Sequence, residues 1–209
     1  MPATETIMLF MVSALALNVT PGPSIAYVMS RSFGQGRTAG LVSALGLGTG
    51  SLLHAIAATL GLSAVVAHSP LAYAVVKYLG AAYLVYLGVG LLRQRTVRLG
   101  DAMPPRLSLS RVYWQGALTE ILNPKVALFF LAFLSQFVDP ARGSVARQTL
   151  FFGLLFHVTG VPINMLVAVS GSAIAASFSR NPLFERIRNW ISGTVLIGLG
   201  VRLALSERR

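Results

Sequence analysis

Long apolar stretches separated by short basic connections dominate the pattern of this chain. The stretches without any charged residue are 7–30, 38–76, 78–92, 126–138 and 148–179. A helix of about 20 apolar residues matches the ~30 Å hydrocarbon core of a bilayer, and the second stretch is long enough to cross twice, with a turn at 68–70. The pattern predicts six membrane-spanning helices, at residues 5–28, 39–67, 71–92, 113–138, 148–178 and 190–206.

The composition indicates an all-α, polytopic membrane protein. Of the 209 residues, 55% are hydrophobic and 11% are charged, and the mean hydropathy is +0.70, whereas a soluble domain needs more charge to cover its surface. We expect no cleaved signal peptide, because the N-terminal MPATET has no Lys or Arg and no clear cleavage site follows the first span. The chain has no cysteine, and we expect no cofactor and no resident metal.

The net charge of +11 lies in the connections between spans, which favours a topology signal over a nucleic-acid surface. With the N-terminus outside, ten basic residues fall on the cytoplasmic side: Arg31, Arg37, Arg93, Arg95, Arg98, Arg106, Arg111, Arg180, Arg186 and Arg188. The outer side holds Arg142, Arg147, Arg208 and Arg209, with Arg202 at the end of the last span. The positive-inside rule therefore predicts that both termini lie outside, in a protein of the inner-membrane type.

The pattern predicts one transporter domain, 1–209, made of two half-repeats. A basic cytoplasmic loop at 93–112 separates three spans in about 1–95 from three spans in about 108–209. An odd number of spans per half inverts the second half relative to the first. A shift of 103 residues also places Pro21 on Pro124, Gly50 on Gly153 and His54 on His157. We therefore expect two inverted three-helix repeats.

Prolines interrupt the first span of each half. The first break is Pro21-Gly22-Pro23 and the second is Pro124, and an asparagine precedes each of them, Asn18 and Asn123. Broken helices at corresponding positions of two inverted halves indicate the substrate site of a transporter. The alternative is a packing kink, which stays equally open for Pro162 in the fifth span.

A proline in a helix releases the carbonyl four residues before it, which must then face protein or a water-filled cavity. Pro21 and Pro23 are expected to release the carbonyls of Leu17 and Val19, and Pro124 that of Glu120.

Glu120 and Lys125 are charged residues well inside a span, as is Lys77. Such a charge costs ~3 kcal/mol on insertion scales and is by default a functional candidate. Glu120 and Lys125 differ by about 140° on a regular helix, so only the break can turn both toward one cavity. Lys77 can snorkel toward the outer surface. Glu120 is then the candidate proton-linked group; in the competing interpretation it pairs with Lys125 or Lys77 to hold helices together.

Two further patterns have a structural and a functional interpretation. His54 and His157 occupy mirrored positions and are either hydrogen-bonded core histidines or a proton relay, since no carboxylate or thiolate accompanies them as a metal ligand. Gly46 and Gly50, four residues apart, favour close helix packing. A dinucleotide fingerprint is disfavoured there, because the third glycine is misplaced and no strand precedes it.

Five motifs occur along the chain in the order typical of one known family. They are TPGP (20–23), GRTAG (36–40), YLGAAYLVYLG (78–88), NPKVALFFLAF (123–133) and GLGVRLAL (198–205). On these motifs the chain resembles the lysine exporter / homoserine–threonine exporter (LysE/RhtB) family of amino-acid efflux proteins. The resemblance implies a six-helix exporter driven by protons. Many members carry an acidic residue directly after Pro-Gly-Pro, a natural partner for a substrate ammonium or a proton. This chain has Ser24 at that position, so the role of partner shifts toward Glu120.

The leading hypothesis is a secondary exporter of amino acids or related small zwitterions, coupled to protons by antiport. The candidate substrate-binding or coupling residues are Asn18, Pro21, Gly22, Pro23, Ser24, Glu120, Asn123, Pro124 and Lys125. A carboxylate would be met by Lys125, asparagine side chains and helix amide ends, and an ammonium by released carbonyls and Glu120. An intramembrane enzyme is disfavoured, because no H-E-x-x-H or G-x-S-x-G motif is present. An exporter of another solute or a metal cation, a non-transporting assembly subunit, and a homo-oligomer all stay open.

Overall fold

The computed structural model describes residues 2–68, 70–93 and 106–170, with single positions of a last helical stretch at 190, 194, 197, 198, 200, 201, 204 and 205. All secondary structure in this part of the chain is helical, which confirms the all-α prediction there. The α-helices are α1 (Thr4–Val19), α2 (Pro23–Gln35), α3 (Arg37–His68), α4 (Pro70–Arg93), α5 (Leu109–Ile121), α6 (Pro124–Leu128) and α7 (Val145–Ser170). A π-helix (Phe129–Phe133) and two 3₁₀ turns (Leu134–Phe137 and Pro140–Arg142) lie between α6 and α7.

The helices expected for the second and third spans are found as α3 and α4, within two residues at each end. The fifth corresponds to α7, and its last residues, 171–178, lie outside the described part of the chain. The sixth, 190–206, lies mostly outside it as well. The domain organisation and the inverted repeat of the two halves stay predictions.

The first and fourth expected spans are each two helices, not one. α1 and α2 meet at 48°, and α5 meets the helical run from Pro124 to Phe137 at 45°. Pro23 and Pro124 stand at the first position of the new helix, where the missing N–H is not needed, and Pro21 lies in the connection between α1 and α2. The prolines therefore start helices rather than kink them, and α2 continues past the expected end at residue 28 to Gln35.

Helix length and composition suit a membrane. Within the described residues, α3 and α7 are each long and apolar enough to cross a bilayer, and the count rises to four if each bent pair is one span. Apolar side chains also cover outer faces: α1 exposes Met8, Val12, Leu15 and Val19, while Phe10 and Ala14 are buried on its other side. A helix that is apolar on both sides is typical of a lipid environment.

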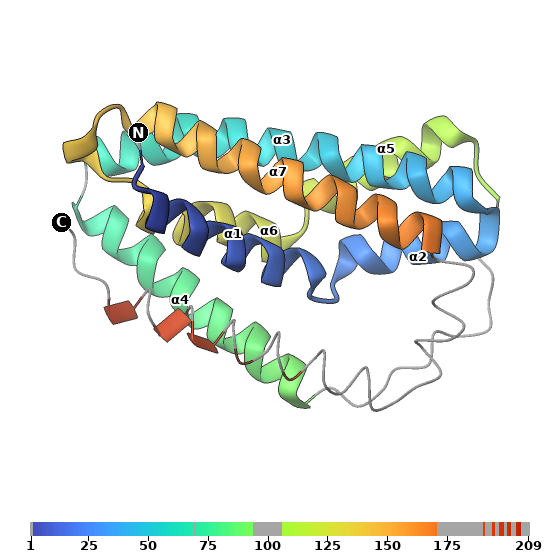
Figure 1. Cartoon of the computed structure of the whole chain (residues 1–209), viewed down its shortest axis with the longest axis horizontal. Coiled ribbons are helices and arrows are strands. Elements are labelled where there is room, and N and C mark those ends of the chain that lie inside the picture. The colour runs from blue at the N-terminus through green and yellow to red at the C-terminus, as the bar shows by residue number, and fades with distance from the viewer. Residues whose placement is uncertain are drawn as a thin grey trace.

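α3 packs alongside α7 over most of its length, and α5 lies against another side of α3 (Figure 1). A Cβ atom on Gly46 would lie 2.1 Å from the backbone oxygen of Tyr113, and one on Gly50 would lie 2.7 Å from that of Ala117. From the other side, a Cβ on Gly116 would lie 2.9 Å from the oxygen of Ser43. The interpretation of the glycine spacing as close helix packing is confirmed.

A cluster of phenylalanines fixes the N-terminal half of α1 against the second half of the chain. Its buried rings are Phe10, Phe129, Phe130, Phe133, Phe137, Phe152 and Phe156. The ring centroid of Phe10 is 4.8 Å from that of Phe152 on α7 and 5.2 Å from that of Phe137. The cluster lies along the segment that follows Pro124, so it holds that segment in place beyond the break.

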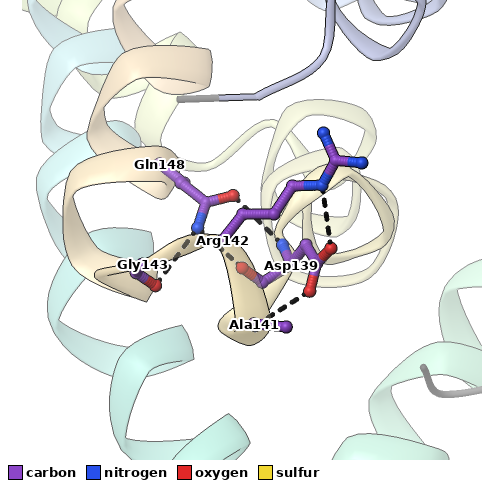
Figure 2. A network of polar contacts seen from close by, with 5 residues as sticks. All are labelled: Asp139, Ala141, Arg142, Gly143 and Gln148. Carbon is purple, nitrogen blue, oxygen red and sulfur yellow. Dashed lines mark hydrogen bonds and ion pairs between the residues drawn. The ribbon is translucent and has the colours of Figure 1, made fainter.

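The turn before α7 is closed by Gln148 (Figure 2). The buried side-chain amide of Gln148 donates to the backbone oxygens of Asp139 at 2.8 Å and Gly143 at 3.3 Å, and it accepts from the Asp139 N–H at 3.1 Å. The Asp139 carboxylate in turn accepts from the Ala141 N–H at 2.9 Å and pairs with Arg142 at 3.3 Å. These bonds satisfy the backbone of a tight connection between two spans.

We predict that Gly46→Ala destabilises the protein by about 1–3 kcal/mol, because its methyl group meets backbone atoms that cannot move aside. Gly61→Ala on the same helix is the matched control, since nothing lies within 4 Å of the position of its Cβ. Thermal unfolding of the purified variants in detergent compares them. Equal melting temperatures for both variants would contradict the close α3–α5 contact.

Candidate functional site

The two helix breaks meet at a buried chain of hydrogen bonds. The hydroxyl of Ser24, at the start of α2, donates to the carboxylate of Glu120, near the end of α5. The side-chain amide of Asn123 donates to the Ser24 oxygen at 2.9 Å. Exposure is 9% for Ser24, 5% for Glu120 and 1% for Asn123. The charged group therefore lies in the protein interior between two broken spans.

Lys125 bridges from the second break to the first. Its ammonium donates to the backbone oxygens of Leu17 at 2.9 Å and Thr20 at 2.8 Å, and the side chain is 7% exposed. The sequence predicted that the carbonyls of Leu17 and Val19 would be released. The Leu17 carbonyl does accept from Lys125, but the second acceptor is the carbonyl of Thr20 and not that of Val19. The reason is geometric: α1 ends at Val19, and the extended backbone of Thr20 (ψ 126°) turns its carbonyl away from the helix.

Glu120 and Lys125 are close but are not a direct ion pair. The carboxylate accepts from Ser24 and the ammonium donates to backbone carbonyls. Within the described residues, the salt bridge present joins Arg142 and Asp139. A direct Glu120–Lys125 pair is therefore not what holds these helices together here. The side chain of Lys77 lies outside the described part, so its pairing with Glu120 is untested.

His54 caps the carbonyl released by Pro124. Its Nε2 lies 3.0 Å from the backbone oxygen of Glu120, and a carbonyl only accepts, so this nitrogen carries the hydrogen. The ring stacks on Phe130, with centroids 5.8 Å apart. The same oxygen accepts from the N–H of Asn123 at 3.1 Å, so His54 adds a second donor to the backbone of Glu120 beside the break.

The remaining sequence candidates point elsewhere. Nδ1 of His157 lies 2.9 Å from the hydroxyl of Ser51, on the face of α3 that meets α7. Asn18 donates to Thr159 at 3.2 Å. Pro162 lies inside α7 without dividing it. The structure therefore groups Ser24, Glu120, Asn123 and Lys125 around the two breaks and leaves Asn18 and His157 against α7.

Gly50 is a site residue that the sequence marked only as a packing residue. A Cβ at this position would lie 2.5 Å from the Cβ of Glu120, so glycine is needed for α3 to approach the carboxylate. Ser51, the partner of His157, carried no sequence signal, because a lone serine in an apolar helix is unremarkable in pattern.

Comparisons with known proteins agree with a membrane transporter. A family model described as LysE type translocator matches residues 15–207. The uncharacterized membrane protein YrhP of Bacillus subtilis (strain 168) is 31% identical over 202 residues, which cover 92% of this chain and 95% of YrhP. The leucine efflux protein of Salmonella typhimurium is 24% identical over 196 residues, which cover 93% of this chain and 92% of that protein. No solved structure matches the chain.

We predict that Asn123→Ala destabilises the protein by about 2 kcal/mol, because it removes both a helix cap on the Lys125 N–H and a buried donor to Ser24. Asn18→Ala is the matched control at the other break and should cost about 1 kcal/mol, since Asn18 is only half-buried and its side chain makes one hydrogen bond. Thermal unfolding in detergent gives both values. A larger loss for Asn18→Ala would contradict the placement of the buried network.

Proposed function

This chain belongs to the LysE type translocator family, and from that premise we propose that it exports an amino acid or a related small zwitterion by proton antiport. The same membership excludes the intramembrane enzyme considered from the sequence. One observation carries the proposal: the helix breaks bring a buried carboxylate, a buried ammonium and released carbonyls into one cluster. We place the transporter in the bacterial cytoplasmic membrane, with both termini periplasmic.

The first break suits the two poles of a zwitterion. The C-terminal end of α1 presents the carbonyls of Leu17 and Thr20, where the negative end of the helix dipole lies. α2 begins with Pro23, which has no N–H, and no side chain caps its start, so we assign the N–H groups of Ser24 and Ile25 to the substrate carboxylate. Discontinuous transporter helices bind substrate charges in this way. The relatives named leucine efflux proteins make leucine the first substrate to test.

Glu120 is the coupling group in this proposal. Its carboxylate has the neutral hydroxyl of Ser24 as its hydrogen-bond donor and lies within a broken span. An ionised Glu120 attracts the substrate's ammonium at the neighbouring carbonyls of Leu17 and Thr20, and a proton on Glu120 removes that attraction, so the proton and the substrate compete. A transporter in which two cations compete for one buried carboxylate exchanges them across the membrane. The other acids in the described part of the chain, Glu5 and Asp139, lie at the N-terminus and in the turn before α7.

We predict that Glu120→Gln inserts normally and loses uphill efflux, because the amide keeps an acceptor for Ser24 and binds no proton. Exchange of substrate down its gradient survives. Uptake of labelled leucine into everted vesicles, with and without a pH gradient, separates the two activities. Full efflux that still depends on the pH gradient in this variant would rule out the coupling role.

The contact between Ser24 and Glu120 provides a matched control. It tests whether coupling needs a carboxylate anywhere at this contact or specifically at position 120. The double variant Ser24→Asp with Glu120→Ser places a carboxylate on the opposite side of the same contact. We expect it to recover part of the pH-driven efflux that Glu120→Ser alone loses. No recovery in a double variant that inserts normally would show that the carboxylate must come from α5.

We predict the orientation from cysteines introduced singly into this cysteine-free chain. Ala141 is exposed in the turn at the same end as the N-terminus, and Thr38 is exposed at the opposite end, where α3 begins (Figure 1). In intact spheroplasts, an impermeant thiol reagent should label Ala141→Cys and should label Thr38→Cys only after permeabilisation. The reverse pattern would place both termini inside.

A further inference from the structure

The carbonyls at the end of α1 form a ready site for a primary ammonium. Two backbone oxygens, of Leu17 and Thr20, converge on one nitrogen at 2.9 and 2.8 Å, in a buried position at the negative end of a helix. The nitrogen in this structure belongs to Lys125, whose own helix, α6, lies across the break. A protein group with the chemistry of the expected substrate thus occupies the site.

Gly22, the residue between the two prolines, borders the Lys125 ammonium. A Cβ at this position would lie 3.3 Å from the Lys125 nitrogen, so the absence of a side chain on Gly22 lets the ammonium approach the break closely. Lys125 has three N–H donors and uses two on these carbonyls. Its four-carbon stem lets the ammonium move while α6 stays in place.

We propose that Lys125 is a tethered stand-in for the substrate's amino group. In the substrate-free protein its ammonium fills the Leu17–Thr20 subsite, and the amino group of an amino acid takes that place on binding. The displaced Lys125 ammonium pairs with the carboxylate of the same ligand. The proposal rests on the proposed function only for the identity of the ligand as an amino acid.

The exchange keeps buried charge balanced. A zwitterion supplies an ammonium for the carbonyls and a carboxylate for Lys125, so no charge is left without a partner. An amine without a carboxylate displaces Lys125 and leaves it unpaired in the interior. An acid without an amine leaves the carbonyls to Lys125 and gains only its remaining donor. The site should therefore select molecules that carry both an ammonium and a carboxylate, because only these leave no buried charge unpaired.

The first test refills the vacated subsite with a free amine. Lys125→Ala is expressed and purified with n-propylammonium chloride, which replaces the atoms lost from the side chain. We expect the melting temperature to rise by several degrees with n-propylammonium and to stay constant with tetramethylammonium, which has no N–H donor. Wild type and Lys77→Ala, the other lysine of the chain, are controls. No rise in Lys125→Ala, or an equal rise in the controls, would overturn an ammonium subsite.

The second test distinguishes displacement from simple carboxylate binding. In wild type, 3-methylbutylammonium, which is leucine without its carboxylate, should compete with labelled leucine at least tenfold less well than leucine does. In Lys125→Met the amine should gain at least tenfold in affinity, because no lysine has to leave. If Lys125 only binds the carboxylate, the variant instead weakens leucine binding and leaves amine binding unchanged, and the stand-in role is wrong.

The two tests separate this inference from the proposed function. Refilling with n-propylammonium needs no transport and no knowledge of the substrate, so it judges the subsite even if leucine is not exported. The comparison of 3-methylbutylammonium with leucine in wild type needs no variant. It therefore tests displacement even if the substitutions at Lys125 prevent folding. Equal competition by the amine and by leucine in wild type would overturn displacement.

Discussion

The structure depends on the requirement that no backbone carbonyl stays without a donor in a medium that contains no water. Two proline breaks release carbonyls inside spans that would otherwise be continuous helices, and side chains from other helices supply the donors. Lys125 reaches the carbonyls of the first break, and His54 reaches the Glu120 carbonyl of the second. These side chains add to local backbone donors, since the Leu17 oxygen also accepts from the Thr20 N–H and the Glu120 oxygen from the Asn123 N–H, both at 3.1 Å.

The same requirement places ionisable groups together at low dielectric. The buried Lys125 ammonium donates to carbonyls of the first break. The buried Glu120 carboxylate accepts from Ser24, which belongs to that same break. A carboxylate and an ammonium then lie near each other without forming an ion pair, and each can exchange its present partner for another. A direct salt bridge would cost the most to separate, since breaking it leaves two buried charges uncompensated.

The glycines of α3 connect this site to the packing of the bundle. Gly46 and Gly50 let α5 approach α3 backbone to backbone, and Gly50 does so directly beside Glu120. The position of the carboxylate is thus fixed by helix packing as well as by its hydrogen bonds. Movement of α5 relative to α3 would therefore carry Glu120 with it.

The sequence by itself determined the helical, membrane-embedded class, the boundaries of α3 and α4 and the places of both breaks, and it singled out Glu120 and Lys125 as charges inside a span. Each of these follows from local rules: apolar length, the geometry of proline, and the cost of a charge in hydrocarbon. Only the tertiary structure decided the partners. In the structure Lys125 bonds to Leu17 and Thr20, Ser24 to Glu120, and His157 to Ser51. Sequence pattern could not predict these contacts, because they join residues far apart in the chain and depend on how the helices cross. Asn18 shows the limit of pattern: like Asn123 it lies shortly before a proline, yet it is still inside α1 and donates to Thr159 on α7, whereas Asn123 caps α6.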